Sequence, residues 1–279
     1  MIRLRGINRS GLEYSRERLD PRELDEIASW GANFIRVPFN QRWLLDDPSY
    51  LDQLAEVAAL AAERALHTLF DLHWLDFGQE RGTNPDGSNI ATPPLPDGDT
   101  PSAWSKMAAR FGTDPYVMFD LLNEPHDRLP DDQFPLLAAD GSELRAPAVG
   151  PAEWHPWVRQ LAAAIRPRAP DTPLFVSGTD WGFRCTDLDL PGIVHAPHVY
   201  PYEGRRTRAD WERAFGHLRA PVVVTELGPV TDDLSPIAAL FDFLDERGFG
   251  WAAWSWRDRP QLVENGQPTA FGRLVRSRF

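Results

Sequence analysis

Short apolar runs and longer amphipathic segments alternate along the whole chain. The short runs are rich in β-branched and aromatic residues, as strands are, and the segments between them have the character of helices in βα units. Eight strands are predicted, near residues 2–7, 33–38, 68–73, 117–123, 174–178, 193–200, 222–227 and 250–256. Eight βα units favour an α/β fold, one (β/α)8 TIM barrel that forms a single domain over residues 1–279.

Three of the intervening segments carry apolar residues at the spacing of one helix face. They cover residues 54–61, 154–161 and 237–244. For the last of these helices, Ser235 is expected to cap the N-terminus and Gly248 to end the helix. The apolar faces are expected to pack on the outside of the barrel.

Three connections depart from this pattern. Residues 77–101 and 126–150 are long, polar and rich in Pro and Gly, and residues 179–191 predict a loop with at most one helical turn. The two long segments follow strand C-termini, which form the functional rim of a parallel barrel. We therefore expect these two loops to form subsites in the walls of a substrate cleft.

Composition supports one folded core and narrows the range of partners. The chain has 279 residues, 42% of them hydrophobic, and no low-complexity linker divides it. Its net charge of -12 would repel nucleic acid and anionic membranes, so neither is expected as a partner, and a polyanionic substrate is not expected. Cys185 is the single cysteine, so no disulfide within the chain is expected.

The first residues, MIRLRGIN, lack the apolar stretch of a secretory signal, and no run of about 18 apolar residues could span a membrane. We expect a soluble monomer. Its compartment stays open, because it would be extracellular if a leader had been trimmed.

Polar and aromatic residues gather at predicted strand C-termini and are expected to meet on one rim. They are Arg36, His73, Asn123, Glu124, His198, Tyr200, Glu226 and Trp254. Two of them, Glu124 and Glu226, suit glycosidic cleavage, in which one carboxyl protonates the leaving oxygen and the other attacks the anomeric carbon. A separation of about 5–5.5 Å between the carboxyls means retention and about 6.5–9.5 Å means inversion, and the sequence leaves this distance open.

Several of these residues also fit a purely structural or a metal-binding role. Glu124 could stabilise the first turn of a helix, and Glu226 could be a strand-end charge paired with Arg36. Asp71 with His73, and His198 with Tyr200, could each be a pair of metal ligands, but no His-x-His follows the first strand, so neither a metal nor a cofactor is expected. A carbohydrate-binding barrel without catalysis is the non-enzymatic alternative, and the presence of both carboxylates disfavours it.

Aromatic residues suggest where sugar rings would stack, because the chain has 11 tryptophans. Trp154 and Trp157 belong to a predicted helix face and are assigned to packing. The candidate outer subsites follow strand ends, at Trp74, Trp181, Tyr202 and Trp256.

Seven motifs, in order and at βα spacing, resemble glycoside hydrolase family 5, the cellulase-type branch of the retaining barrel glycosidases. They are RGINRSG at 5–11, FIRVPFN at 34–40, DLHW at 71–74, FDLLNEPH at 119–126, HVY at 198–200, VVTELG at 223–228 and WAAWSW at 251–256. The resemblance implies retaining hydrolysis of a β-linked oligo- or polysaccharide, with endo-β-1,4-glucanase activity expected first. β-Mannanase, β-1,3-glucanase and β-glucosidase activities remain as alternatives, and endo or exo action stays open.

The resemblance also implies roles for the residues at the rim. Glu124 would be the acid/base and Glu226 the nucleophile. Arg36 and Tyr200 would orient and stabilise Glu226, and His198 would tune Glu124.

The remaining roles concern the sugar itself. Asn123 would contact the 2-hydroxyl of the sugar at the cleavage site, and His73 would bind the same sugar. Trp254 would form the floor of that subsite. Trp256 would take this role instead if the family motif were aligned two residues later.

Overall fold

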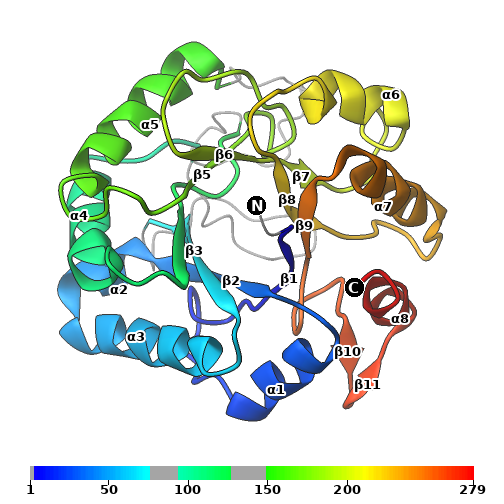
Figure 1. Cartoon of the computed structure of the whole chain (residues 1–279), viewed down its shortest axis with the longest axis horizontal. Coiled ribbons are helices and arrows are strands. Elements are labelled where there is room, and N and C mark those ends of the chain that lie inside the picture. The colour runs from blue at the N-terminus through cyan, green and yellow to red at the C-terminus, as the bar shows by residue number, and fades with distance from the viewer. Residues whose placement is uncertain (1–2, 76–93, 127–148) are drawn as a thin grey trace, which may run out of the picture.

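Residues 3–75, 94–126 and 149–279 are described by the computed structural model, and they form a ring of strands surrounded by helices (Figure 1). Among these residues, nine strands form the main sheet: β1 (Arg5–Asn8), β2 (Phe34–Asn40), β3 (His67–Trp74), β4 (Val117–Asp120), β5 (Leu174–Ser177), β6 (Ile193–Ala196), β7 (His198–Val199), β8 (Val223–Leu227) and β9 (Gly250–Ala253). They lie in the order β6-β5-β4-β3-β2-β1-β9-β8-β7, and each hydrogen-bonded pair is parallel. The barrel predicted from the sequence is confirmed.

The predicted sixth strand is divided in two. Pro197 lies between β6 and β7, and it has no N–H to donate to a sheet ladder. β6 pairs with β5, whereas β7 pairs with β8. An isolated parallel bridge joins His195 of β6 to Val222, directly before β8, so the eight predicted strands appear as nine in a nearly closed ring.

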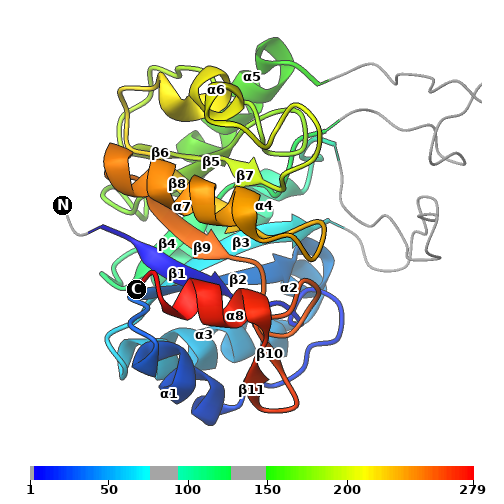
Figure 2. The ribbon, with the colours of Figure 1, turned by 90° about the vertical axis from the view of Figure 1, so that its right-hand side faces the viewer.

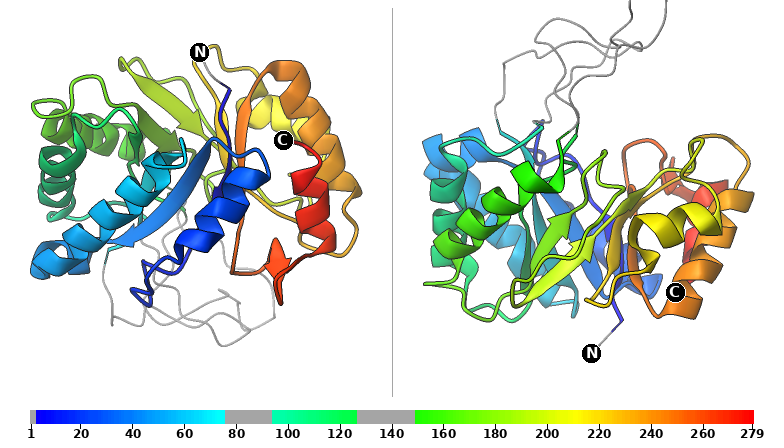
Figure 3. Two further views of the ribbon diagram at one scale, coloured as in Figure 1. Left: turned by 60° about the horizontal axis from the view of Figure 1, so that its bottom comes forward. Right: turned by 90° about the horizontal axis from the view of Figure 1, so that it is seen from above.

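The helices cover the outside of the ring, as Figures 2 and 3 show from other directions. They are α1 (Pro21–Ser29), α2 (Gln41–Asp46), α3 (Pro48–Ala62), α4 (Thr100–Phe111), α5 (Pro151–Ile165), α6 (Arg208–Trp211), the π-helical segment η1 (Glu212–Gly216), α7 (Ser235–Arg247) and α8 (Ala270–Arg276). A small antiparallel hairpin of β10 (Val263–Glu264) and β11 (Gln267–Pro268) precedes α8. No helix lies within residues 179–191, as predicted. In the described ranges, no helix has both the length and the apolar character needed to cross a bilayer.

The two ends of α7 give one correct and one wrong prediction. Gly248 ends the helix in the left-handed region at φ 67, as expected of a C-terminal glycine. Ser235 is not the N-cap, because the helix begins at Ser235 and Leu234 occupies the capping position. The Ser235 N–H instead donates to the Asp233 carboxylate at 2.9 Å, so an earlier acidic side chain satisfies this donor.

The interior of the barrel is built in two layers. The apolar layer consists of Phe34, Leu69, Met118, Phe175, Ala196, Val223 and Ala252. Because side chains on a strand alternate between faces, residues two positions further along point the same way. Those positions hold Arg36, Asp71, Asp120, Ser177, His198, Thr225 and Trp254. An apolar plug therefore supports a mainly polar layer on the side of the strand C-termini.

Candidate active site

Arg36 of β2 lies at the centre of the polar layer, with its side chain fully buried. Its guanidinium contacts three carboxylates: Glu226 Oε1 at 2.5 Å, and Asp71 Oδ1 and Asp120 Oδ2 at 3.0 Å each. Its Nη2 also donates to Asn123 Oδ1 at 3.0 Å. Burial by itself lowers the pKa of Arg36, but the three carboxylates outweigh burial and raise it, so the guanidinium stays charged.

Replacing Arg36 with leucine is expected to destabilise the fold by about 3–5 kcal/mol, because the buried carboxylates would lose their shared cation. We expect the Tm to fall by roughly 6–20 °C in a calorimetric scan. Arg42→Leu is the matched control, since its ion pair with Asp46 lies on the surface, with 53% and 55% of the two side chains exposed. That change should cost less than about 1 kcal/mol. Equal shifts for both variants would contradict a structural role for the buried pairing.

Glu226 reaches the same site from β8, and an irregularity of the sheet sets the direction of its side chain. The register between β8 and β9 shifts between Val224 and Leu227, and such irregularities redirect side chains at barrel rims. Thr225 and Glu226 are consecutive, yet both approach His198, which regular alternation would not allow. The Glu226 carboxylate is only 4% exposed.

Two donors orient the Glu226 carboxylate. Arg36 donates to Oε1, and the Tyr200 hydroxyl donates to Oε2 at 2.9 Å. Burial, followed by the negative charge of Glu226, raises the pKa of Tyr200 well above its ordinary value, so the phenol keeps its proton. The carboxylate is thus held at both oxygens by groups that stay hydrogen-bond donors.

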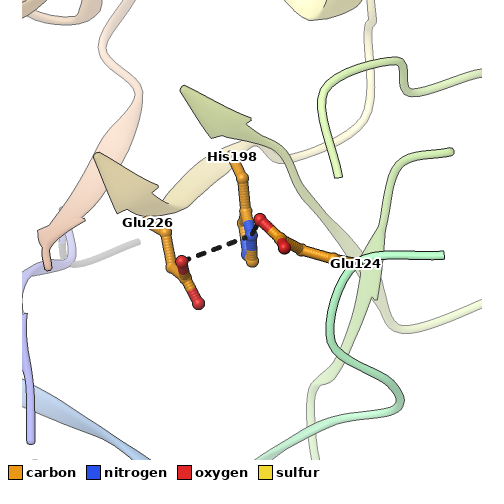
Figure 4. Close-up of side chains that lie close together, drawn as sticks. All are labelled: Glu124, His198 and Glu226. Atoms are coloured by element: carbon orange, nitrogen blue, oxygen red, sulfur yellow. Dashed lines mark hydrogen bonds and ion pairs between the residues drawn. The ribbon is translucent and has the colours of Figure 1, made fainter. Parts of the chain in front are cut away.

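Glu124 follows β4 and lies on the other side of His198 (Figure 4). Its backbone is in the left-handed region at φ 43, a conformation that costs a non-glycine residue about 1–3 kcal/mol and clusters at functional sites. Glu124 Oε1 lies 2.8 Å from His198 Nδ1. Burial raises the pKa of Glu124 and lowers the pKa of His198 to about 4. These shifts favour a protonated carboxyl beside a neutral imidazole.

The two glutamates come close together around this imidazole. One ligand atom from each of Glu124, His198 and Glu226 can be chosen so that all three lie within 4.8 Å of one another. Figure 4 shows both carboxylates beside the histidine ring. One carboxylate oxygen of Glu124 therefore lies within 4.8 Å of one of Glu226, an approach compatible with the separation of about 5–5.5 Å between carboxyl groups in retaining glycosidases.

A second group of side chains extends the site from β3 towards β9. His73 Nδ1 lies 2.6 Å from Asp71 Oδ2, and Asn123 Nδ2 lies 3.3 Å from His73 Nε2. Burial lowers the pKa of His73, but the charge of Asp71 outweighs burial, so the pKa rises to about 9. The Trp254 ring stacks beside the His73 ring, with centroids 5.6 Å apart and planes at 23°. All eight rim residues named from the sequence therefore belong to one contiguous site.

Three residues of this network were not identified as site residues from the sequence. Asp71 and Asp120 are fully buried ion-pair partners of Arg36, and Asn8 Oδ1 accepts a hydrogen bond from Arg36 Nη1 at 3.0 Å. Asp71 and Asp120 lie inside predicted apolar runs, where a carboxylate is unfavourable unless a partner is present, and this was the signal that could have identified them. Asn8 directly follows the first predicted strand, at the same rim as the other site residues.

The candidate outer subsites differ in their surroundings. Trp181 stacks on His126 with centroids 4.0 Å apart and planes at 9°, and its backbone N–H donates to the Pro125 carbonyl at 3.2 Å. Trp74 is partly buried, and Tyr202 is exposed at 59%. These three side chains have surface available for a sugar ring.

Trp256 does not fit this assignment. It is only 4% exposed, and its ring meets the Trp30 ring edge-on at 5.1 Å. This packing in the core leaves no face for a sugar ring. The prediction for Trp256, as an outer subsite and as a competitor of Trp254, is corrected accordingly.

The expectation that loops 77–101 and 126–150 wall the cleft falls largely outside the described residues. Only residues 94–101, 126 and 149–150 of these segments are described. The prediction for these loops therefore stays a prediction.

A parallel barrel with two neighbouring glutamates, oriented by arginine, tyrosine and histidine at its strand C-termini, has the architecture of a barrel glycoside hydrolase. Residues 2–260 match the family model described as cellulase (glycosyl hydrolase family 5). The chain belongs to this family, and the resemblance inferred from its motifs is confirmed.

Curated relatives agree with this membership. The chain is 23% identical to Endoglucanase 5 of Pectobacterium carotovorum subsp. carotovorum, over 93% of this chain and 48% of the relative. It is also 23% identical to Endoglucanase N of Pectobacterium atrosepticum, over 93% of this chain and 54% of that relative. The chain thus spans about half the length of these relatives.

Solved structures share the fold. The catalytic domain of Thermobifida fusca endoglucanase Cel5A superposes with a TM-score of 0.73 at 18% identity, over 99% of this chain and 91% of that chain. The hyperthermophilic endocellulase of the archaeon Pyrococcus horikoshii gives a TM-score of 0.76 at 20% identity, over 99% and 92% of the two chains. At these identities the comparison shows the fold.

Proposed function

We propose that this chain is a retaining glycoside hydrolase that cleaves β-linked glucan, with endo-β-1,4-glucanase as the specific activity. The observation that carries the proposal is the approach of the Glu124 and Glu226 carboxylates to within 4.8 Å around His198. This close approach supports a direct attack by one carboxylate, because inversion requires carboxyl groups roughly 6.5–9.5 Å apart to admit a water molecule.

The mechanism has two displacements. Glu226, oriented by Arg36 and Tyr200, attacks the anomeric carbon while protonated Glu124 donates its proton to the leaving oxygen. The ionised Glu124 then takes a proton from water, which hydrolyses the glycosyl-enzyme. The His198 ring, with Nδ1 2.8 Å from Glu124 Oε1, holds the Glu124 carboxyl in position beside Glu226.

The glucan specificity is supported by the names of the relatives, which are endoglucanases, and by a Pyrococcus horikoshii structure described as a complex with cellotetraose. Around the cleavage site, Asn123, His73 and Trp254 are proposed to bind one sugar unit. Trp181 and Tyr202 are proposed as outer platforms.

One experiment tests both parts of the proposal. Purified protein is screened for release of reducing sugar from carboxymethyl cellulose, mixed-linkage β-glucan, mannan and laminarin. We expect activity on the first two, and proton NMR of early products should show the β-anomer, because two inversions restore the configuration. An α-anomer as the first product would contradict retention, and preferential cleavage of mannan or laminarin would contradict the glucan assignment. Activity that disappears with EDTA would indicate a metal-dependent hydrolase instead.

The pH dependence of kcat/KM should show the acid role of Glu124. Because burial raises the pKa of Glu124 above its ordinary value, its proton is kept to higher pH than in an exposed glutamate, and kcat/KM should fall as the pH rises through that pKa. A cellobioside with a dinitrophenolate leaving group needs no protonation, so its alkaline limb should be much weaker. Identical alkaline limbs for this substrate and for cellotetraose would contradict the assignment.

A further inference from the structure

We propose that Glu124, His198 and Glu226 also form a three-ligand site for a divalent transition-metal ion such as Zn²⁺, and that the bound ion blocks the active site. Among the described residues, this is the one group of three His, Cys, Asp or Glu side chains whose ligand atoms all lie within 4.8 Å of one another. One imidazole nitrogen with two carboxylate oxygens is a ligand set that Zn²⁺ accepts, with water in the fourth position.

The distances are close to those of a coordinated ion. Tetrahedral ligands about 2.1 Å from Zn²⁺ lie about 3.4 Å from one another. His198 Nδ1 lies 3.6 Å from Glu226 Oε2 and 2.8 Å from Glu124 Oε1. The carboxylate oxygens lie within 4.8 Å of each other, so they would have to approach by at most about 1.4 Å, through rotation of the glutamate side chains.

The environment of His198 is compatible with the tautomer that a metal needs. Its Nε2 lies 3.0 Å from Thr225 Oγ1, and its side chain is fully buried. When Nε2–H donates to this hydroxyl, Nδ1 is left with its lone pair directed at the two carboxylates. Metal-bound histidines are commonly held in this way by a hydrogen bond at the other ring nitrogen.

The nearby arginine does not prevent the binding of a cation. The charge of Arg36 is shared among three carboxylates, since Asp71 and Asp120 also pair with it. Arg36 contacts Glu226 through Oε1, so the Oε2 atom that faces His198 remains available as a ligand. The Tyr200 hydroxyl donates to Oε2 but leaves a second lone pair on it.

Zinc binding is measured by isothermal titration calorimetry with ZnCl₂ and no substrate. We expect one ion per wild-type chain, and Glu226→Gln should weaken binding about tenfold or more, because an amide is a poorer ligand than a carboxylate. Thr225→Val should weaken it by about 10–100-fold through loss of the hydrogen bond to Nε2. His217→Gln, which alters an exposed histidine, is the matched control and should bind like the wild type. Circular dichroism melts establish that each variant is folded.

Wild-type affinity in a folded Glu226→Gln protein, or no saturable binding by the wild type, would overturn the site. The blocking effect rests on the proposed function and has its own measurement. Zn²⁺ should raise the KM for cellotetraose without lowering kcat, and EDTA should reverse this, whereas a fall in kcat at unchanged KM would overturn the blocking. If no glycan is hydrolysed but zinc binding follows the variants as expected, the proposed function fails and the metal site stands.

Discussion

Glu226→Gln is expected to lower kcat on cellotetraose by about 10³-fold or more, a loss of at least about 4 kcal/mol of transition-state stabilisation. The amide cannot form the covalent bond to the anomeric carbon that the proposed mechanism requires. The shape of the side chain is kept, and its oxygen can still accept the hydrogen bond from Arg36. The fold should therefore be retained, with Arg36 still paired to Asp71 and Asp120.

The measurement compares steady-state kinetics and Tm of this variant with those of the wild type. Glu264→Gln is the matched control, because Glu264 is exposed on the hairpin strand β10, and it should leave both quantities unchanged. Wild-type turnover of an unactivated oligosaccharide by Glu226→Gln would exclude Glu226 as the nucleophile. A collapse of Tm would instead mean that its main role is to balance the charge of Arg36.

The second large effect is expected for Glu124→Ala, and it should depend on the substrate. For cellotetraose, whose leaving group needs a proton, kcat/KM should fall by about 10²–10⁴-fold. For a dinitrophenyl cellobioside the first displacement needs no acid, so kcat/KM should stay within about tenfold of the wild type. The glycosyl-enzyme should then accumulate as a burst, because no base activates water.

Azide provides the decisive control for this variant. A small anion needs no general base, so azide should speed turnover by Glu124→Ala and give a β-glycosyl azide, with the configuration of the substrate. Glu226→Gln should not give this product, since it forms no glycosyl-enzyme. Equal losses on both substrates without azide rescue would show that Glu124 is not the acid/base.

The strands were predictable, whereas their ends were not. The fourth strand was predicted to reach residue 123 but ends at Asp120, and the last was predicted to reach residue 256 but ends at Ala253. Apolar residues continue past both strand ends. The hydrophobic pattern therefore does not show where the backbone leaves the sheet. Glu124 thus lies beyond a strand, and its left-handed φ was not predicted from the sequence.

Side-chain partners were predicted only for one pair of opposite charges. The pairing of Glu226 with Arg36 was anticipated, but Asp71 and Asp120 were not recognised as further partners of the same guanidinium. Trp256 shows the opposite error, because its place after a strand suggested a sugar platform and the chain instead turns it against Trp30. Both cases depend on neighbours that lie far away along the chain.

The sequence by itself determined the kind of fold and which acidic residues lie near the carboxyl-terminal rim, because apolar periodicity and the polar residues that follow it are local properties of the chain. Only the tertiary structure decided that the Glu124 and Glu226 oxygens approach within 4.8 Å, that three carboxylates share Arg36, and that an irregularity in β8 brings Glu226 to His198. These features arise from closure of the barrel, which sets distances between side chains that no local pattern relates.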